Sequence, residues 1–209
     1  MVSAKEYAQN VYFLIDRSGS MAGKKWVQAC EAFRAFLRTL EPQDRAWVTF
    51  FETRYQDLAE KPLPPGALLS EPAVQSLDRI GTGDGTELLP ALKHVLGAIH
   101  RHSNHRNTAI VLITDGQVGN EATILQRLGS YASLRVHVFG IDATINDGFL
   151  NKLAAQHHGT SCLLAPTDDI VGAVARLGDR LRRPVLTDIQ APKGWEVAGA
   201  ALPDGRIAG

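Results

Sequence analysis

The sequence predicts an α/β fold, in which a doubly wound, mainly parallel sheet carries helices on both faces. Two observations support this prediction. Short apolar runs of strand length alternate along most of the 209 residues with segments whose apolar residues recur at the helical period of about 3.6 residues. Such alternation implies right-handed crossovers between parallel strands, with the crossover helices packed on the sheet. The length fits one domain of ordinary size.

The strands are predicted from short, mostly apolar runs, which are typical of parallel strands buried on both faces. TAIVLIT at 108–114 is the strongest of these runs. TRYQDLA at 53–59 is expected to form a short antiparallel edge strand beside its predecessor. The other strands are expected at 10–15, 45–52, 134–141 and 160–165.

The helices are predicted from apolar spacing and from capping residues. Ser70 is a candidate N-cap for one helix, and Thr167 or Asp168 for the last. Gly159 is expected to end a helix in the left-handed C′ position. The proline-rich segment KPLPPG at 61–66 is expected to be a loop. The helices are expected at 24–40, 70–80, 87–100, 120–132, 147–159 and 167–183.

Composition bounds the domain organisation and the class of partner. We interpret residues 1–183 as one domain and 184–209 as a C-terminal extension that begins a truncated β-rich region, because this segment has no helical period. No apolar run approaches about 18 residues, so no membrane span is expected. The formal net charge of +0 argues against a nucleic-acid partner. The first residues lack the apolar core of a signal peptide, so the sequence indicates no compartment.

Candidate functional residues lie in three loops at or near the carboxyl ends of predicted strands, where open α/β sheets bind ligands. Asp16, Ser18 and Ser20 follow the first strand, Thr86 closes the loop GTGDGT, and Asp115 ends the run 108–114. In an extended loop, residues two apart share a side, so the first three side chains are expected to converge. On the same reasoning Arg17 points away, and Gly19 permits a tight turn.

The chemistry of these residues favours a hard divalent cation. All of them donate oxygen, which suits Mg²⁺, with Mn²⁺ or Ca²⁺ as further candidates. Two carboxylates roughly neutralise such an ion, and hydroxyl groups add no charge. If the carboxylates act partly through water, the ion still attracts an anion. We therefore expect the site to receive an Asp or Glu carboxylate from a protein partner.

The ordered set Asp16-x-Ser18-x-Ser20, Thr86 and Asp115 resembles the complete metal-ion-dependent adhesion site of von Willebrand factor type A domains. The segments FLIDRSGSM and VLITDG are similar to the usual sequence motifs of that family, and the resemblance covers roughly 10–183. It implies a Rossmann-like sheet with Mg²⁺ at its top and a role in adhesion or protein interaction. Ser18 and Ser20 would bind the metal directly, Thr86 directly or through water, and both aspartates through water.

A looser resemblance points to one subgroup of this family. GTELLPAL, LITDGQVGNE and LRRPVLTDI are similar to segments of the inter-alpha-trypsin-inhibitor heavy-chain group. In that group the domain lies between β-rich regions.

We thus expect a metal-dependent protein-binding module rather than an enzyme, and two alternatives stay open. The first is an intracellular scaffold that works with an ATPase or a large assembly, which would use the same metal site. The second is a metal-dependent hydrolase, because haloacid-dehalogenase-type phosphatases place their nucleophile at the end of the first strand. Those enzymes need a second acid two residues later, where this chain has Ser18.

Overall fold

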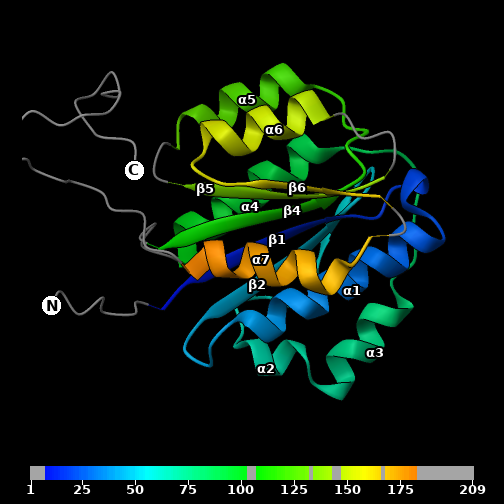
Figure 1. Cartoon of the computed structure of the whole chain (residues 1–209), viewed down its shortest axis with the longest axis vertical. Helices are drawn as coiled ribbons and strands as arrows, with labels where there is room; N and C mark the ends of the chain where they lie inside the picture. Colours follow the sequence, from blue (N-terminus) through cyan, green and yellow to red (C-terminus); the bar gives the residue numbers. More distant parts are fainter. Residues whose placement is uncertain (1–7, 103–106, 132–133, 143–146, 166–167, 183–209) are drawn as a thin grey trace, which may run out of the picture.

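A six-stranded sheet with helices on both faces forms the described part of the chain (Figure 1). The computed structural model describes residues 8–102, 107–131, 134–142, 147–165 and 168–182. The strand order is β3-β2-β1-β4-β5-β6, and only the β2–β3 pairing is antiparallel. The predicted fold class is confirmed. The strands are β1 (Asn10–Asp16), β2 (Arg45–Phe51), β3 (Tyr55–Asp57), β4 (Thr108–Thr114), β5 (Arg135–Ile141) and β6 (Ser161–Leu164).

The helices divide between the two faces of the sheet. The helix that follows β1 packs on one face together with α2, α3 and the last helix, and the remaining helices cover the other face (Figure 1). The first group is α1 (Lys24–Thr39), α2 (Pro65–Leu68), α3 (Glu71–Arg79) and α7 (Ile170–Arg182). The second group is α4 (Leu88–His102), α5 (Glu121–Gly129) and α6 (Asp147–Gln156). None of the described helices is long and apolar enough to cross a membrane.

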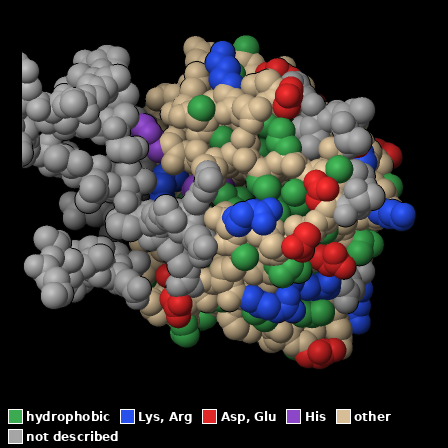
Figure 2. Space-filling view, in the orientation of Figure 1, with side chains coloured by type: hydrophobic (Ala, Val, Ile, Leu, Met, Phe, Trp, Pro, Cys, Tyr) green, Lys and Arg blue, Asp and Glu red, His purple; other side chains and the backbone are tan. Residues whose placement is uncertain are grey.

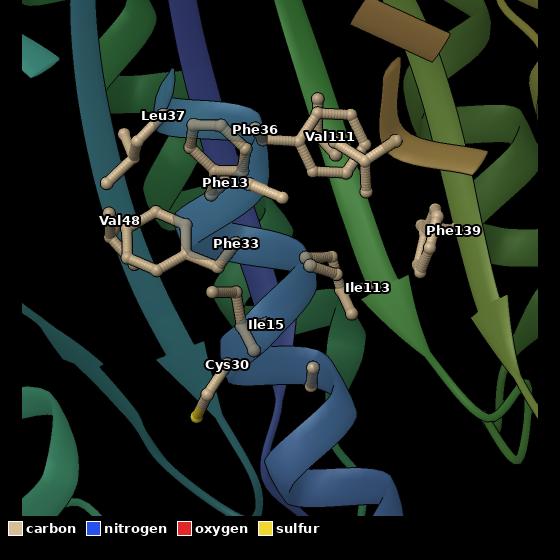
Figure 3. Close-up of a cluster of buried hydrophobic side chains, with 14 of the residues drawn as sticks. Phe13, Ile15, Cys30, Phe33, Phe36, Leu37, Val48, Val111, Ile113 and Phe139 are labelled. Carbon is tan, nitrogen blue, oxygen red and sulfur yellow. The ribbon is translucent and has the colours of Figure 1, made fainter. Parts of the chain in front are cut away.

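The core explains why β1 is apolar on both of its sides. Phe13 faces α1 and belongs to one buried cluster, whereas Tyr12 belongs to the cluster on the α4 side. The ring of Phe36 from α1 lies edge-on to Phe139 of β5, with ring centroids 5.7 Å apart, and Phe33 lies edge-on to Phe13 at 5.1 Å (Figure 3). These contacts fix α1 across the middle of the sheet.

The strand order reverses direction beside β1. From β1 the chain builds the sheet outward through β2 and β3 on one side, and through β4, β5 and β6 on the other. The order therefore reverses between β1 and β4, which is where open α/β sheets bind ligands at their carboxyl edge. The register pairs Ile15 with Ile113, so these two strands end side by side.

The structure differs from the sequence prediction at α2 and at the start of α7. The end of the expected loop at 61–66 enters α2, where Pro65 takes the first helical position that proline tolerates. Asp168 is not the cap that precedes α7, because its side chain accepts a hydrogen bond from the Ala165 amide and the helix begins two residues later; the alternative cap, Thr167, lies outside the described residues. Asp169 precedes the helix and accepts a hydrogen bond from the Gly172 amide at 3.1 Å.

Gly159 does not have the predicted left-handed conformation. That conformation belongs to the preceding residue, His158, with φ 51°. A Cβ at Gly159 would lie 1.8 Å from the carbonyl oxygen of Val136 in β5. Glycine is required there because the chain after α6 passes directly against a strand.

The expected C-terminal extension at 184–209 lies outside the described residues. The division into 1–183 and 184–209 therefore stays a prediction.

Candidate functional site

The loop after β1 begins with a buried carboxylate that joins two strands. Asp16 has no exposed surface, and its Oδ2 accepts a hydrogen bond from the hydroxyl of Thr114 at 2.7 Å. Its Oδ1 accepts one from the Ser18 amide at 2.9 Å. Thr114 is the last residue of β4, so this carboxylate ties together the ends of β1 and β4.

Burial dominates the electrostatics of Asp16. It raises the pKa of this carboxyl above its ordinary value, because the charged form loses its hydration. The hydrogen bonds from Thr114 and Ser18 oppose this rise, and the nearby Asp115 adds to it. A nearby cation would therefore stabilise the charged form of Asp16.

Ser18 and Ser20 bring two hydroxyl groups next to this carboxylate. Their Oγ atoms lie 3.0 Å apart, and Ser18 is almost fully buried. The prediction that this loop is extended was wrong, because residues 19–21 form a 3₁₀ helix. The side chains are thus brought together by a tight turn rather than by strand-like alternation.

Arg17 and Gly19, which alternate with the candidate ligands, contact neighbouring loops instead. Arg17 points away from the serines, as expected, and its Nη2 donates to Glu52 Oε1 at 2.7 Å. Gly19 has no positive φ. A Cβ at Gly19 would lie 3.3 Å from the carbonyl oxygen of Gly83, so glycine permits a close approach of two loops.

Hydrogen bonds from backbone amides fix the loop that carries Thr86 to the first loop and to Glu52, which follows β2. The Gly83 amide donates to the Arg17 carbonyl at 2.8 Å, and the Asp84 amide donates to Glu52 Oε2 at 3.0 Å. The Glu87 amide donates to the Glu52 carbonyl at 2.7 Å. These bonds hold the half-buried Thr86 at the same edge of the sheet, although they place its backbone rather than its hydroxyl.

Asp115 follows β4 and is fully buried. Its Oδ1 accepts a hydrogen bond from the Gln117 amide at 3.2 Å, and its Oδ2 accepts one from Lys25 Nζ at 3.1 Å. The intervening Gly116 has φ 82°, a left-handed conformation that suits glycine. The turn therefore directs this carboxylate toward α1 and the first loop.

Sequence reasoning missed Lys25, Thr114 and Asp142. Lys25 Nζ also contacts Asp142 Oδ2, at 2.5 Å. Burial alone would lower the pKa of Lys25, but its hydrogen bonds with Asp142 and then Asp115 outweigh burial and raise it. Asp142 directly follows β5 and Thr114 ends β4, so the carboxyl-edge rule could have found both residues.

The donor set is oxygen-rich but holds few carboxylates. Within the described ranges, no group of three or more His, Cys, Asp and Glu side chains could hold a metal ion. The predicted set contains only two carboxylates, and hydroxyl groups supply its other oxygens. Hard oxygen donors of this kind fit Mg²⁺ rather than zinc.

The comparisons with known proteins agree with the fold. The sequence model of the von Willebrand factor type A domain matches residues 9–162. The chain belongs to the von Willebrand factor type A domain family. Domains of this family bind protein partners, and its members are mostly interaction or adhesion modules.

Relatives of the type A domain include inter-alpha-trypsin-inhibitor heavy chains, at low identity. The chain is 28% identical to inter alpha-trypsin inhibitor, heavy chain 4 of Mus musculus, with 87% of this chain and 21% of that protein covered. It is 27% identical to von Willebrand factor A domain-containing protein 5B1 of Homo sapiens, with 94% and 17% covered. The chain thus spans about a fifth of the length of these relatives.

Solved structures share the fold of the type A domain. Von Willebrand factor type A from Catenulispora acidiphila superposes with a TM-score of 0.70 at 18% identity, over 84% of this chain and 42% of that chain. The SpRpn10 VWA domain superposes with a TM-score of 0.66 at 10% identity, over 87% of this chain and 100% of that chain. At these identities the likeness shows the fold alone.

Proposed function

We propose that this type A domain binds a divalent cation and uses it to capture an Asp or Glu side chain of a protein partner. The observation that carries the proposal is a buried carboxylate beside two paired hydroxyl groups at the carboxyl edge of the sheet. Mg²⁺ is the cation that we propose first, and Mn²⁺ or Ca²⁺ could replace it. The residues that would hold it are Asp16, Ser18, Ser20, Thr86 and Asp115.

The hydrogen bonds of the carboxylates support an indirect role for both. Each oxygen of Asp16 and each oxygen of Asp115 accepts a bond from the chain itself. Such carboxylates suit water-mediated contact with Mg²⁺, which retains several of its waters. Ser18 and Ser20 would then bind directly as neutral ligands. A cation bound in this way would keep a net positive charge, and the carboxylate of a partner could take one of its coordination positions.

The family and the relatives support an interaction module rather than an enzyme. Heavy-chain relatives favour a role among protein assemblies, but the chain covers only about a fifth of their length. The likeness to the SpRpn10 domain is a likeness of fold, so it does not favour the scaffold alternative.

Metal binding can be tested by titrating the metal-free protein with Mg²⁺ in a calorimeter. We expect saturable binding to the wild type and a loss of at least about tenfold in affinity for Asp16→Asn, which removes a charge at nearly constant shape. Ser18→Ala combined with Ser20→Ala should weaken binding as well. Ser76→Ala is the matched control, because this exposed hydroxyl donates to the Pro72 carbonyl within α3. Equal, weak binding by all of these proteins would contradict the proposal.

Capture of a carboxylate can be tested with a displayed library of random peptides. Peptides selected in Mg²⁺ should contain an Asp or Glu whose replacement by Asn or Gln abolishes binding. Binding should also vanish when a chelator is added. Peptides that bind equally well in chelator would count against a metal-dependent site.

A further inference from the structure

Lys25 places a positive charge directly beside the candidate metal site. It lies in the first turn of α1, and its Nζ bridges Asp115 Oδ2 at 3.1 Å and Asp142 Oδ2 at 2.5 Å. Its side chain is only 21% exposed, and Asp115 is fully buried. The bridge therefore joins three elements, α1 and the ends of β4 and β5.

The position of this lysine is unfavourable for local helix structure. A cation in the first turn of a helix meets the positive end of the helix dipole. The adjacent Lys24 is exposed to solvent, but Lys25 is directed at two carboxylates. The tertiary contacts must outweigh the local cost, which points to a role at the carboxyl edge.

We propose that Lys25 is a positioning residue of the metal site. Through its ion pair with Asp115, it offsets part of the negative charge that this carboxylate offers to a metal cation. Asp142 weakens this effect, because it binds the same ammonium group. This inference rests on the proposed function. With its Oδ2 engaged by Lys25, Asp115 neutralises a neighbouring cation less completely. The cation is then held more weakly by the domain, but it keeps a stronger attraction for the carboxylate of a partner.

The two partners of the bridge give predictions of opposite sign. Removing the charge of Lys25 frees Asp115, so cation affinity should rise. Removing the charge of Asp142 leaves Lys25 with Asp115 as its charged partner, so cation affinity should fall. A role limited to holding the fold would not produce opposite signs.

The experiment measures Mg²⁺ affinity by calorimetry for the full chain and its variants. Lys25→Gln should tighten Mg²⁺ binding roughly three- to tenfold, and Asp142→Asn should weaken it roughly threefold. Lys25→Arg, which keeps the charge and can bridge two carboxylates, should restore near wild-type affinity. Lys24→Gln removes an equal charge one residue away and should change affinity by less than about twofold.

Thermal unfolding supplies a second measurement. In chelator, Lys25→Gln should have a lower melting temperature than the wild type, because Asp115 and Asp142 lose the lysine ammonium group that bridges them. Saturating Mg²⁺ should then raise its melting temperature by more than that of the wild type. At saturating Mg²⁺, the same variant should bind a selected acidic peptide more weakly than the wild type does.

The outcomes separate the inference from the proposed function. If the wild type binds no Mg²⁺, the proposed function fails, and the inference fails with it. If the wild type binds Mg²⁺ but Lys25→Gln binds equally or more weakly, only the inference is overturned. Equal tightening in Lys24→Gln would show a general charge effect and would also overturn it, as would unchanged binding in Asp142→Asn.

Discussion

At the scale of single residues, the carboxyl edge is arranged so that its acidic groups are satisfied by the chain itself. Asp16 is held by Thr114 and Ser18, and Asp115 is held by Lys25 and Gln117. Such bonds fix the carboxylates before any cation arrives, which reduces the reorganisation that binding requires. The serine hydroxyl groups bond to each other instead, so they can exchange that bond for a cation at small cost.

One residue-scale prediction concerns Gly159. Gly159→Ala should destabilise the domain by at least about 2 kcal/mol, because the new methyl group would overlap the Val136 carbonyl and push the chain away from β5. Urea unfolding measures the effect. Gly129→Ala is the matched control: a Cβ there meets nothing within 4 Å, and alanine should be neutral or stabilising by up to about 1 kcal/mol. Equal stability of the two variants would contradict the packing argument.

The sequence could identify some residues of the candidate site but not others. Asp16, Ser18 and Ser20 are neighbours in one loop, so their grouping can be read from the chain. The contact between Lys25 and Asp142 spans 117 positions and depends on how α1 crosses the ends of β4 and β5. No periodicity encodes that crossing. The 3₁₀ turn was missed for a related reason, since contacts with the Gly83 loop shape the segment around Gly19.

At the scale of elements, α1 connects the core to the candidate site. Its first turn supplies Lys25, and its middle packs Phe33 and Phe36 against the sheet (Figure 3). The same helix also contacts α7. A change in the seat of α1 would therefore move the lysine relative to Asp115.

Phe36→Ala tests how firmly α1 is seated. We expect it to lower the free energy of unfolding by about 3 to 5 kcal/mol, because Phe36 is fully buried between Phe13 and Phe139. Val27→Ala on the same helix should change stability by less than about 0.5 kcal/mol, since Val27 is 55% exposed. Chemical denaturation of both variants measures the contrast. Similar losses in the two would argue against this seating of the helix.

Strands with continuous apolar runs could be predicted from the sequence, whereas the one-turn helix α2 could not. Each of the long apolar runs became a strand within one or two residues of its predicted bounds, because two-sided burial demands continuous apolar character. The helix α2 is only four residues long, which is about one turn and too short to show a period. Pro65 and the prolines before it are equally typical of a loop, so the sequence favoured a loop over the start of this helix.

At the scale of the whole molecule, the described chain enters and leaves at the edge opposite the candidate site. β1 begins at Asn10 and ends in the site loop, and α7 returns from the end of β6 to the starting edge (Figure 1). Arg135 at the start of β5 donates to the Leu181 carbonyl at 3.0 Å and fixes this return. On the face drawn in Figure 2, both Lys or Arg and Asp or Glu side chains of the described residues are visible.

The stability of the whole molecule should depend on pH through His157. This residue follows α6 and is 1% exposed. Burial lowers the pKa of His157 below its ordinary value of 6.5, and the charge of the neighbouring His158 lowers it further. Interactions with the backbone of Leu134 and Tyr131 offset only part of this effect.

The domain should therefore lose stability as the solution becomes mildly acidic. As the pH falls, the unfolded chain takes up a proton at His157 near pH 6.5, before the folded protein does. The stability that the neutral His157 contributes is therefore fully present above that pH. It then falls as the pH drops through 6.5 toward the lower pKa of the folded state. Urea midpoints at pH 8 and pH 5.5 measure the loss, which should shrink in His157→Gln. His158→Asn tolerates the left-handed backbone and should keep most of the loss, because the charge of His158 is the smaller cause. An unchanged pH dependence in His157→Gln would assign the loss to other groups.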